Sequence, residues 1–540
     1  MTLTADEAAA RAALLSVARY DVRFDLREFA ARGTFRTHAR VEFGCAAPGA
    51  ASWIDLLARA VRRARLNGAD LDLARCWDGE RIALAGLAER NVLVVESEHD
   101  AGAGRGLSRS VDPADGAVYA WTQFQPYDAR RAFACFDQPS LKAPVAIAAI
   151  VPDGWTCVSN GVARMGDADG DDADGGDAEG GARTWTFSTT PPLPTYAMAF
   201  AAGPFHVVAG HVMEGTAVTG TAVTGAVVGQ PGPAGPVGPP GPAGPVGAVA
   251  VRLHARRSLA ARLDRDAPEL LALTAAGLEF FGREFDLPYP ASSYDYVFLP
   301  DQPGAMENFG CVTWGDAVLR PEAPTDSQRQ RRASVLLHEM AHMWFGDLVT
   351  PAWWDGLWLN ESFASWAGGW AEAALRGDDV GWQRFLLTRE IPAQLADDGP
   401  TSHPIDRPVP DVDAAEANFD LITYVKGTAV LRQLVAWVGE EAFLTGIRRY
   451  FRRFAWRNAT MADLLDELSA ASGRELRSWA GDWLGRAGVN TVSVAASVSG
   501  AGGRDLAAGE RYESVELVQD GGGGPRPHRL RLGVYDADPD

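Results

Sequence analysis

One short motif constrains this chain more than any other feature. The stretch Ser334–Phe345 reads S-V-L-L-H-E-M-A-H-M-W-F, and its only ionisable side chains are His338, Glu339 and His342. Residues four apart on a helix lie about 40° apart around the axis and one turn along it. Two imidazoles so placed can bind one Zn²⁺, with the intervening glutamate beside the open coordination position as a general base. The motif predicts an apolar helix that carries a metal site.

A chance match is the competing interpretation, because a lone histidine on an apolar stretch is usually a packed core residue. With nine His in the chain, a chance H-E-x-x-H match has a probability on the order of one in a hundred. A third candidate ligand, Glu361, follows His342 after 18 intervening residues, in a second apolar helical stretch. A buried carboxylate without a cation is costly, and zinc would supply one. His338, His342 and Glu361 form the His₂Glu set typical of catalytic zinc.

The region before the motif has the alternation of a β domain. Thr4 and Glu7 stand in a capping-box relation, which predicts a short N-terminal helix. From Tyr20 onward apolar and charged residues alternate, and short strand-like runs recur at Thr37–Phe43, Val92–Glu96, Val145–Val151 and Thr184–Ser188. We expect residues 1–212 to form an N-terminal, mainly antiparallel β domain.

Two low-complexity segments interrupt the chain. Residues 166–181 hold six Asp, one Glu and many Gly, but they lack the Gly and Glu that an EF-hand loop needs. A solvated loop is favoured over a calcium site. In residues 213–250, glycine recurs at every third position from Gly229 to Gly247, which is the local rule of collagen. The run is too short for an unaided triple helix, so it favours a semi-rigid linker at the first domain boundary.

The pattern turns helical beyond residue 251. One apolar helical face runs from Leu270 to Phe285, Tyr294–Leu299 has the composition of a strand, and helical periods dominate from Ser327 to about Ala480. From Val489 the alternation of strands returns, at Val492 and Val494, at Val515 and Leu517, and at Leu530, Leu532 and Val534. We expect residues 489–540 to be the start of a small β-sandwich.

Charge and composition exclude several classes of partner. The formal charge of −20 disfavours nucleic-acid binding. No run approaches 18 consecutive apolar residues, and Asp6 and Glu7 stand where a secretory signal would be basic, so no membrane partner is expected. The five cysteines are scattered and never in C-x-x-C spacing, which favours free thiols in a reducing compartment. These features predict a cytoplasmic protein.

Four sequence blocks carry a resemblance to a known family. They are H-E-M-A-H with Glu361, G-A-M-E-N at Gly304–Asn308, T-Q-F-Q at Thr122–Gln125 followed by Asp128–Phe133, and Y-V-K-G at Tyr424–Gly427. In order and spacing they resemble the aminopeptidase N family of gluzincin zinc metallopeptidases, and bacterial members of the actinobacterial kind are most similar. The resemblance implies a multidomain α+β chain with a thermolysin-like zinc peptidase domain at residues 251–488 and one Zn²⁺ per chain.

The resemblance also implies how a substrate would be held. Glu307 would bind the free α-ammonium of a peptide, which makes a peptidase an aminopeptidase. Gly304 and Ala305 would offer backbone groups to the extended peptide. Gln123 and Met306 would line the pocket for the first side chain.

The resemblance implies that two further residues would act on the reacting bond. Glu339 would activate the attacking water, and Tyr424 would donate its phenolic proton to the oxyanion opposite the zinc.

Two features depart from the family pattern. Gln125 stands where most aminopeptidases of this kind have Glu as a second carboxylate for the ammonium. The chain ends at Asp540, so we expect the C-terminal helical domain of the family to be absent by truncation.

The leading hypothesis is a monomeric zinc aminopeptidase that acts on peptides with a free N-terminus. One alternative within the family is an enzyme like the bifunctional leukotriene hydrolase, in which Gln also occurs at the position of Gln125. Another, from a different class, is a non-catalytic peptide-binding or scaffold protein. Zinc content together with turnover of an aminoacyl nitroanilide separates the classes.

Overall fold

A computed structural model of the protein describes residues 2–166, 181–213, 248–498, 512–521 and 524–533. Most of the acidic segment (167–180) and of the Gly-Pro segment (214–247) lies outside these ranges, so both interpretations stay predictions. Helices and sheets both build the molecule, which confirms the mixed α+β class. Within the described ranges, no helix combines the length and apolar character that a membrane crossing needs.

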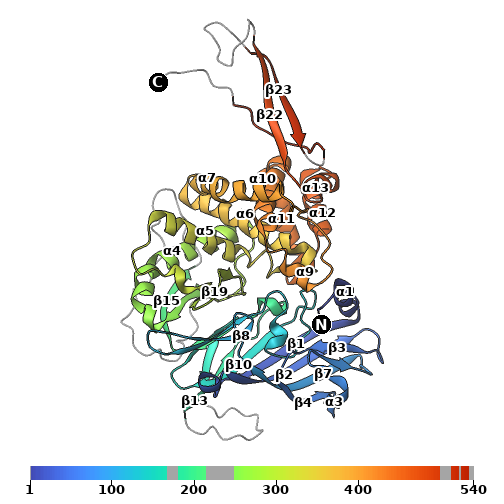
Figure 1. The fold of residues 1–540 in the computed structure, drawn as a ribbon, viewed down its shortest axis with the longest axis vertical. Coiled ribbons are helices and arrows are strands. Elements are labelled where there is room, and N and C mark those ends of the chain that lie inside the picture. Colours follow the sequence, from blue (N-terminus) through green and yellow to red (C-terminus); the bar gives the residue numbers. More distant parts are fainter. Residues whose placement is uncertain (1, 167–180, 214–247, 499–511, 522–523, 534–540) are drawn as a thin grey trace.

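Two large β-sheets build most of the N-terminal unit, in the lower part of Figure 1. The predicted N-terminal helix is α1 (Ala5–Leu14), with both hydrogen bonds of the capping box. The eight-stranded sheet has the order β12 (Ala163–Gly166), β13 (Ala182–Phe187), β10 (Val145–Pro152), β1 (Leu15–Asp25), β2 (Thr34–Cys45), β7 (Arg90–Asp100), β4 (Ala60–Leu66) and β5 (Ala69–Asp70). The second sheet has the order β11 (Thr156–Ser159), β14 (Phe200–Gly203), β9 (Val118–Gln123) and β8 (Gly106–Val111).

The strands predicted for this unit are confirmed, with two differences. Strand β1 begins at Leu15 rather than Tyr20, and it pairs in parallel with β10 in an otherwise antiparallel sheet. A separate two-stranded pair is formed by β3 (Ser52–Asp55) and β6 (Arg81–Leu84). Short helices α2 (Phe29–Arg32) and α3 (Leu73–Cys76) complete the unit.

Strand β9 joins the N-terminal unit to the rest of the molecule. Ala120 packs into the core between the two sheets, whereas Tyr119 and Trp121 pack into a second cluster that includes Val297 and Leu299. Successive side chains of a strand point to opposite faces, so one strand can contribute to both cores. Because β9 ends at Gln123, it delivers the T-Q-F-Q block to the junction between the units.

A five-stranded sheet underlies the second unit. Its order is β15 (Phe205–Met213), β16 (Ala248–Arg256), β17 (Ser293–Leu299), β19 (Cys311–Gly315) and β18 (Ala305–Met306). Strands β16, β17 and β19 are parallel, and β15 and β18 are antiparallel edge strands. Because β15 pairs with β16, the change of sheet falls between Gly203 and Phe205, ahead of the boundary predicted at residue 212. The Gly-Pro segment thus connects two neighbouring strands of one sheet.

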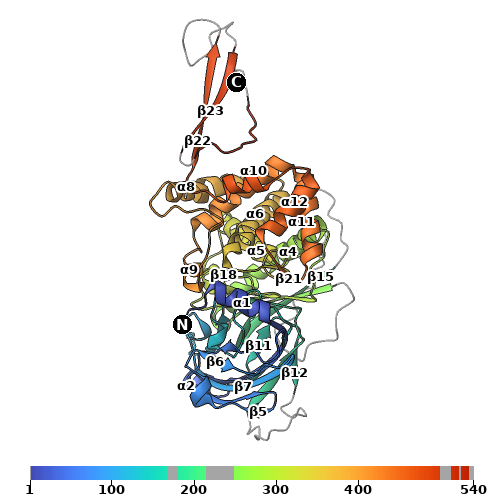
Figure 2. The same cartoon turned by 90° about the vertical axis from the view of Figure 1, so that its right-hand side faces the viewer.

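A helical layer lies on the side of this sheet away from the N-terminal unit (Figure 2). Its helices are α4 (Ala260–Glu284), α5 (Asp326–Ala341), α6 (Leu357–Arg376), α7 (Val380–Phe385), α8 (Ile391–Asp397), α10 (Gly427–Val438), α11 (Glu440–Phe454), α12 (Met461–Ser472) and α13 (Arg477–Trp483). The short helix α9 (Val412–Glu416) instead lies beside α1 at the junction of the two units (Figure 1). Helices α5 and α6 meet at the centre of this layer, where Leu337, Met340 and Phe363 are fully buried. The predicted helix at Leu270–Phe285 is present as α4, and the predicted strand at Tyr294–Leu299 is β17.

The C-terminal region forms a hairpin that extends away from the helices (Figure 1). Strands β22 (Asn490–Val498) and β23 (Tyr512–Gly521) pair with each other in an antiparallel sheet of two strands. These are the first two predicted alternations. The third predicted strand was wrong for the residues that the structure describes, because residues 524–533, which include Leu530 and Leu532, form no strand.

Candidate active site

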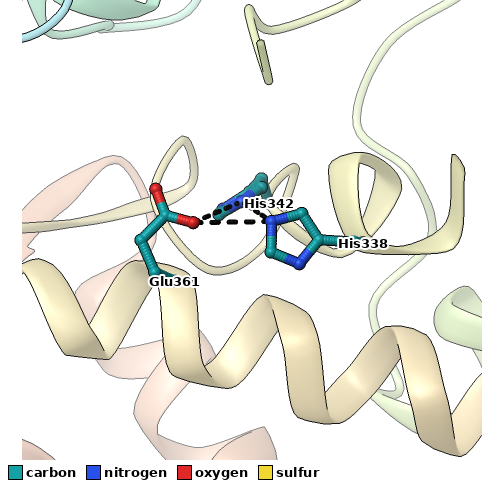
Figure 3. A group of neighbouring side chains, drawn as sticks. All are labelled: His338, His342 and Glu361. Carbon is teal, nitrogen blue, oxygen red and sulfur yellow. Dashed lines mark hydrogen bonds and ion pairs between the residues drawn. The ribbon is translucent and has the colours of Figure 1, made fainter. Parts of the chain in front are cut away.

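The predicted metal ligands come together where helices α5 and α6 pack. Helix α5 ends at Ala341, so it is shorter than the helix predicted through Phe345, and His342 is its C-terminal cap residue. The backbone of His342 keeps right-handed helical angles, so its ring still lies one turn beyond His338. Glu361 comes from the second turn of α6. The three side chains point toward one another (Figure 3).

The three ligand atoms form a nearly equilateral triangle. His338 Nε2 lies 3.0 Å from His342 Nε2, and Glu361 Oε2 lies 3.4 Å and 3.5 Å from these two nitrogens. Ligands at tetrahedral positions about 2.0–2.1 Å from a zinc ion are about 3.3–3.4 Å apart. The residues present therefore fit one zinc ion in both donor type and spacing.

The second nitrogen of each imidazole is held by a polar neighbour. His342 Nδ1 lies 2.5 Å from Asn360 Oδ1 and 3.0 Å from the carbonyl oxygen of Phe345, so Nδ1 carries the proton. His338 Nδ1 lies 3.1 Å from Ser365 Oγ. Such contacts fix the tautomer and the direction of a metal-binding imidazole. Sequence reasoning missed Asn360 and Ser365, although polar residues within the apolar stretch around Glu361 were a usable signal.

Two further carboxylates lie next to the ligand triangle. One oxygen each of Glu307 and Glu339 and one nitrogen of His342 lie within 4.8 Å of one another. Burial raises the pKa of Glu339 well above its usual range, and the charge of Glu307 adds to the rise. Burial also raises the pKa of Glu307. Burial acts in the same direction on Glu361, but the two imidazoles outweigh it and lower that pKa to about 2.

The G-A-M-E-N block lies at an open edge of the five-stranded sheet. Among the strands that the structure describes, β18 (Ala305 and Met306) pairs only with β19, and Gly304 and Glu307 flank it directly. Gly304 has a φ of 70°, a conformation that favours glycine. An edge strand presents unpaired N–H and C=O groups, which an extended peptide can bind.

The T-Q-F-Q block meets this edge from the N-terminal unit. Gln125 Nε2 donates to Glu307 Oε1 over 3.3 Å, and Asn360 Nδ2 donates to the same oxygen over 3.0 Å. Gln123 Nε2 lies 3.8 Å from Met306 Sδ. The peptide bond between Gln125 and Pro126 is cis. The predicted substrate residues therefore lie together, although they come from two units of the molecule.

Tyr424 also lies beside the metal ligands. It is in η7 (Ile422–Lys426), a π-helix of one turn that continues into α10. Its ring is 6.3 Å from that of His338, with an angle of 23° between the ring planes. Burial raises the pKa of Tyr424 well above its usual range, and the charge of Glu361 adds to this. The phenol therefore stays protonated and can donate a hydrogen bond.

One buried acid of the site has no counterpart in the sequence reasoning. Asp347 is fully buried, and neither of its carboxylate oxygens has a hydrogen-bond partner among the described residues. Burial, together with the charge of Glu307, raises its pKa well above the usual range. Lys142 from the N-terminal unit lies close by and donates to the backbone carbonyls of Asp347 and Leu348, over 2.8 Å and 3.2 Å.

Comparison with known proteins finds two matching domain families in the chain. The Peptidase family M1 domain matches residues 270–483, and the Peptidase M1 N-terminal domain matches residues 105–197. Aminopeptidase N of Streptomyces lividans is 39% identical over 99% of this chain and 58% of its own length. Aminopeptidase 2, mitochondrial, of Saccharomyces cerevisiae is 33% identical over 71% of this chain and 35% of its own length. Leucyl aminopeptidase of Saccharolobus solfataricus is 28% identical over 86% of this chain and 53% of its own length.

The two domain matches together cover more than half of the chain, and both belong to one family. The chain is a member of the M1 peptidase family, which confirms the resemblance drawn from the four sequence blocks. It spans about half the length of the curated relatives that it matches.

Proposed function

We propose that the protein is a zinc-dependent aminopeptidase that hydrolyses the N-terminal peptide bond of peptides, as a monomer in the cytoplasm. The observation that carries the proposal is the pairing of a zinc-sized ligand triangle (His338, His342 and Glu361) with two further buried carboxylates within reach of it. Glu339 would act as the base of the reaction, and Glu307 would bind the substrate.

The reacting bond would lie between Glu339 and Tyr424. Bound zinc supplies a Lewis acid that polarises the scissile carbonyl and lowers the pKa of water. Glu339 takes a proton from the attacking water and passes it to the leaving amine. Burial raises the pKa of Glu339 above its usual range, which makes its carboxylate a stronger base than that of an exposed glutamate. Tyr424 donates its phenolic proton to the carbonyl oxygen as negative charge develops there.

The free N-terminus would be held by Glu307 and Gln125. The amide nitrogen of Gln125 is directed at Glu307, so the Gln125 side-chain oxygen is left to accept from the substrate ammonium. Gly304 and Ala305 pair with the extended backbone of the peptide at the edge of β18. Gln123 and Met306 contact its first side chain. An acetylated N-terminus carries no charge for Glu307 and should be excluded.

The test combines a metal measurement with turnover. After reconstitution, mass spectrometry should find about one zinc per chain, and alanyl- or leucyl-nitroanilide should be hydrolysed while the N-acetylated forms are not. His338→Asn should lose zinc, whereas the matched change His38→Asn, on strand β2 away from the site, should keep it. Zinc without turnover would favour a non-catalytic peptide-binding protein, and equal cleavage of acetylated substrates would rule out an aminopeptidase.

A further inference from the structure

The turn that carries Tyr424 is held at its start by Asp420. Asp420 Oδ1 accepts hydrogen bonds from the backbone N–H groups of Ile422, over 2.9 Å, and Thr423, over 3.0 Å. The backbone carbonyl of Asp420 accepts from the N–H of Tyr424, over 3.1 Å. Three consecutive backbone donors of η7 are therefore bound by one residue. A single turn is weak by itself, because fixing its dihedral angles costs more than its few hydrogen bonds return.

The other carboxylate oxygen of Asp420 is held by His403. His403 Nε2 lies 2.7 Å from Asp420 Oδ2, and His403 Nδ1 lies 2.7 Å from the carbonyl oxygen of Pro404. Nε2 donates to the Asp420 carboxylate, and a hydrogen bond to an ionised acceptor is charge-assisted. The side chain of His403 is 10% exposed and that of Asp420 is 34% exposed, so the pair is partly shielded from solvent. Asp420 is thus fixed in direction before it caps the turn.

The far end of the same turn is fastened by the same segment of chain. Lys426 Nζ lies 2.9 Å from Asp397 Oδ2 and donates to Asp397 Oδ1 over 3.1 Å. Ser402, next to His403, donates to Asp397 Oδ1 over 2.7 Å. Residues 397–403 therefore bind both ends of a five-residue turn, with His403 at its start and Asp397 at its end.

We propose that His403 and Asp420 are positioning residues for Tyr424, which they hold against the metal ligands by fixing the turn η7. The inference rests on the proposed function, in which the Tyr424 phenol donates to the developing oxyanion. That hydrogen bond is made only in the transition state, so loosening the turn lowers kcat and leaves KM and zinc content unchanged. A misplacement of about 1 Å can cost about 10²-fold in rate.

The test is a double-mutant cycle with Tyr424. Asp420→Ala should lower kcat by about 10- to 100-fold, with KM, zinc content and the thermal unfolding midpoint near those of the wild type. Asp420→Asn keeps an acceptor for the backbone N–H groups and should recover part of the loss. In a Tyr424→Phe background, Asp420→Ala should cause no further loss, because the group that it positions is already gone. Asp413→Ala, at an exposed aspartate of α9, is the matched control and should change nothing.

Each of the other outcomes would contradict one part of the proposal. If Asp420→Ala leaves kcat unchanged, or lowers it equally in the Tyr424→Phe background, Asp420 does not act through Tyr424. If Tyr424→Phe alone is fully active, the proposed role of Tyr424 fails, and the positioning role fails with it. If Asp420→Ala does not fold, the same cycle is run with His403→Gln, which removes the charge-assisted bond and leaves the backbone caps in place.

Discussion

Two buried acidic clusters, one in each unit, are built on opposite plans. In the N-terminal unit Asp55 is fully buried, and its two oxygens accept four hydrogen bonds. The donors are Arg11 Nη1 at 2.7 Å, Tyr127 OH at 2.9 Å, the backbone N–H of Asp137 at 3.0 Å and Trp53 Nε1 at 3.1 Å. The cluster supplies its own cation and leaves no lone pair for a ligand.

The acidic cluster of the second unit is not closed in this way. Burial raises the pKa values of Glu307, Glu339 and Asp347, and Asp347 has no hydrogen-bond partner among the described residues. Burying unpaired charge costs free energy, and a protein keeps such groups only where something repays that cost. The comparison teaches that a saturated buried cluster is structural, whereas an unsaturated one can accept added cations, which in the proposed function are a metal ion and a substrate ammonium.

The largest effect that would test this contrast is expected at Glu339. Glu339→Gln keeps the size of the side chain and removes the base, so kcat should fall by about 10²- to 10⁴-fold. Zinc should remain bound, because the ligand triangle is intact. Steady-state kinetics and metal analysis check both points, and an active, zinc-loaded variant would refute the assignment of the base.

In the closed cluster the corresponding change should act on stability. Arg11→Met strands Asp55 as a buried charge, and the free energy of unfolding of the N-terminal unit should fall by about 3 kcal/mol. The lower end of the usual range is expected because Arg81 Nε remains 3.7 Å from Asp55. Urea titration followed by circular dichroism measures the change.

Its matched control is Arg19→Met, since Arg19 pairs with Asp21 at the surface and has a side chain 41% exposed. That pair should contribute less than about 1 kcal/mol. Equal losses of unfolding free energy for Arg11→Met and Arg19→Met would contradict a larger contribution from the buried Asp55 cluster than from a surface ion pair.

Glu307 should affect substrates rather than stability. Glu307→Ala removes a charge-assisted hydrogen bond to the ammonium, worth about 1.5–3 kcal/mol, so kcat/KM on free N-termini should fall about 10- to 100-fold. N-acetylated peptides should be poor substrates for both forms. A wild-type enzyme that cleaves acetylated and free peptides alike would remove the anchoring role.

A smaller gain is expected when the open cluster is made more acidic. Gln125→Glu adds a second carboxylate beside Glu307, worth about 1–2 kcal/mol toward an ammonium, so KM for alanyl or leucyl substrates should fall several-fold with little change in kcat. In a Glu307→Ala background the new carboxylate should partly restore binding. A higher KM in the single variant would show that residue 125 does not face the ammonium.

The smallest effect concerns the anchor of α1 and depends on pH. The hydrogen bond from Arg81 is the main cause that lowers the pKa of Glu7 to about 2, from the usual value near 4.5. A carboxyl with a lowered pKa in the folded state stabilises that state above pH 4.5, and this contribution is lost as the pH falls toward 2. Glu7→Gln should therefore unfold at a lower temperature than the wild type at pH 7, and the difference should shrink below pH 4.5. A constant difference from pH 7 to pH 2 would contradict this linkage.

Features encoded over a few residues could be predicted, and those that join distant segments could not. The capping box at Thr4, the alternation of β2 and β10 and the helical face of α4 are local patterns, and all appear where expected. Strand β15 was expected in the N-terminal β domain, but its pairing with β16 puts it in the sheet of the second unit. The two strands lie on either side of a long insert, so their pairing is not a local pattern. The third C-terminal alternation, at Leu530 and Leu532, forms no strand, because alternation without a partner strand does not make a sheet.

The sequence by itself determined the donor set of this protein. The four-residue spacing of His338 and His342 fixes their relation on any helix, and Glu361 from a second element completes the predicted set. Tertiary structure alone decided what surrounds these three residues. It brings Gln125 to Glu307 across two units, leaves Asp347 without a hydrogen-bond partner among the described residues, and lets His403 and Asp420 hold the Tyr424 turn. These contacts join residues far apart in the chain, so they depend on how whole elements pack, whereas a helix sets the spacing of its own side chains.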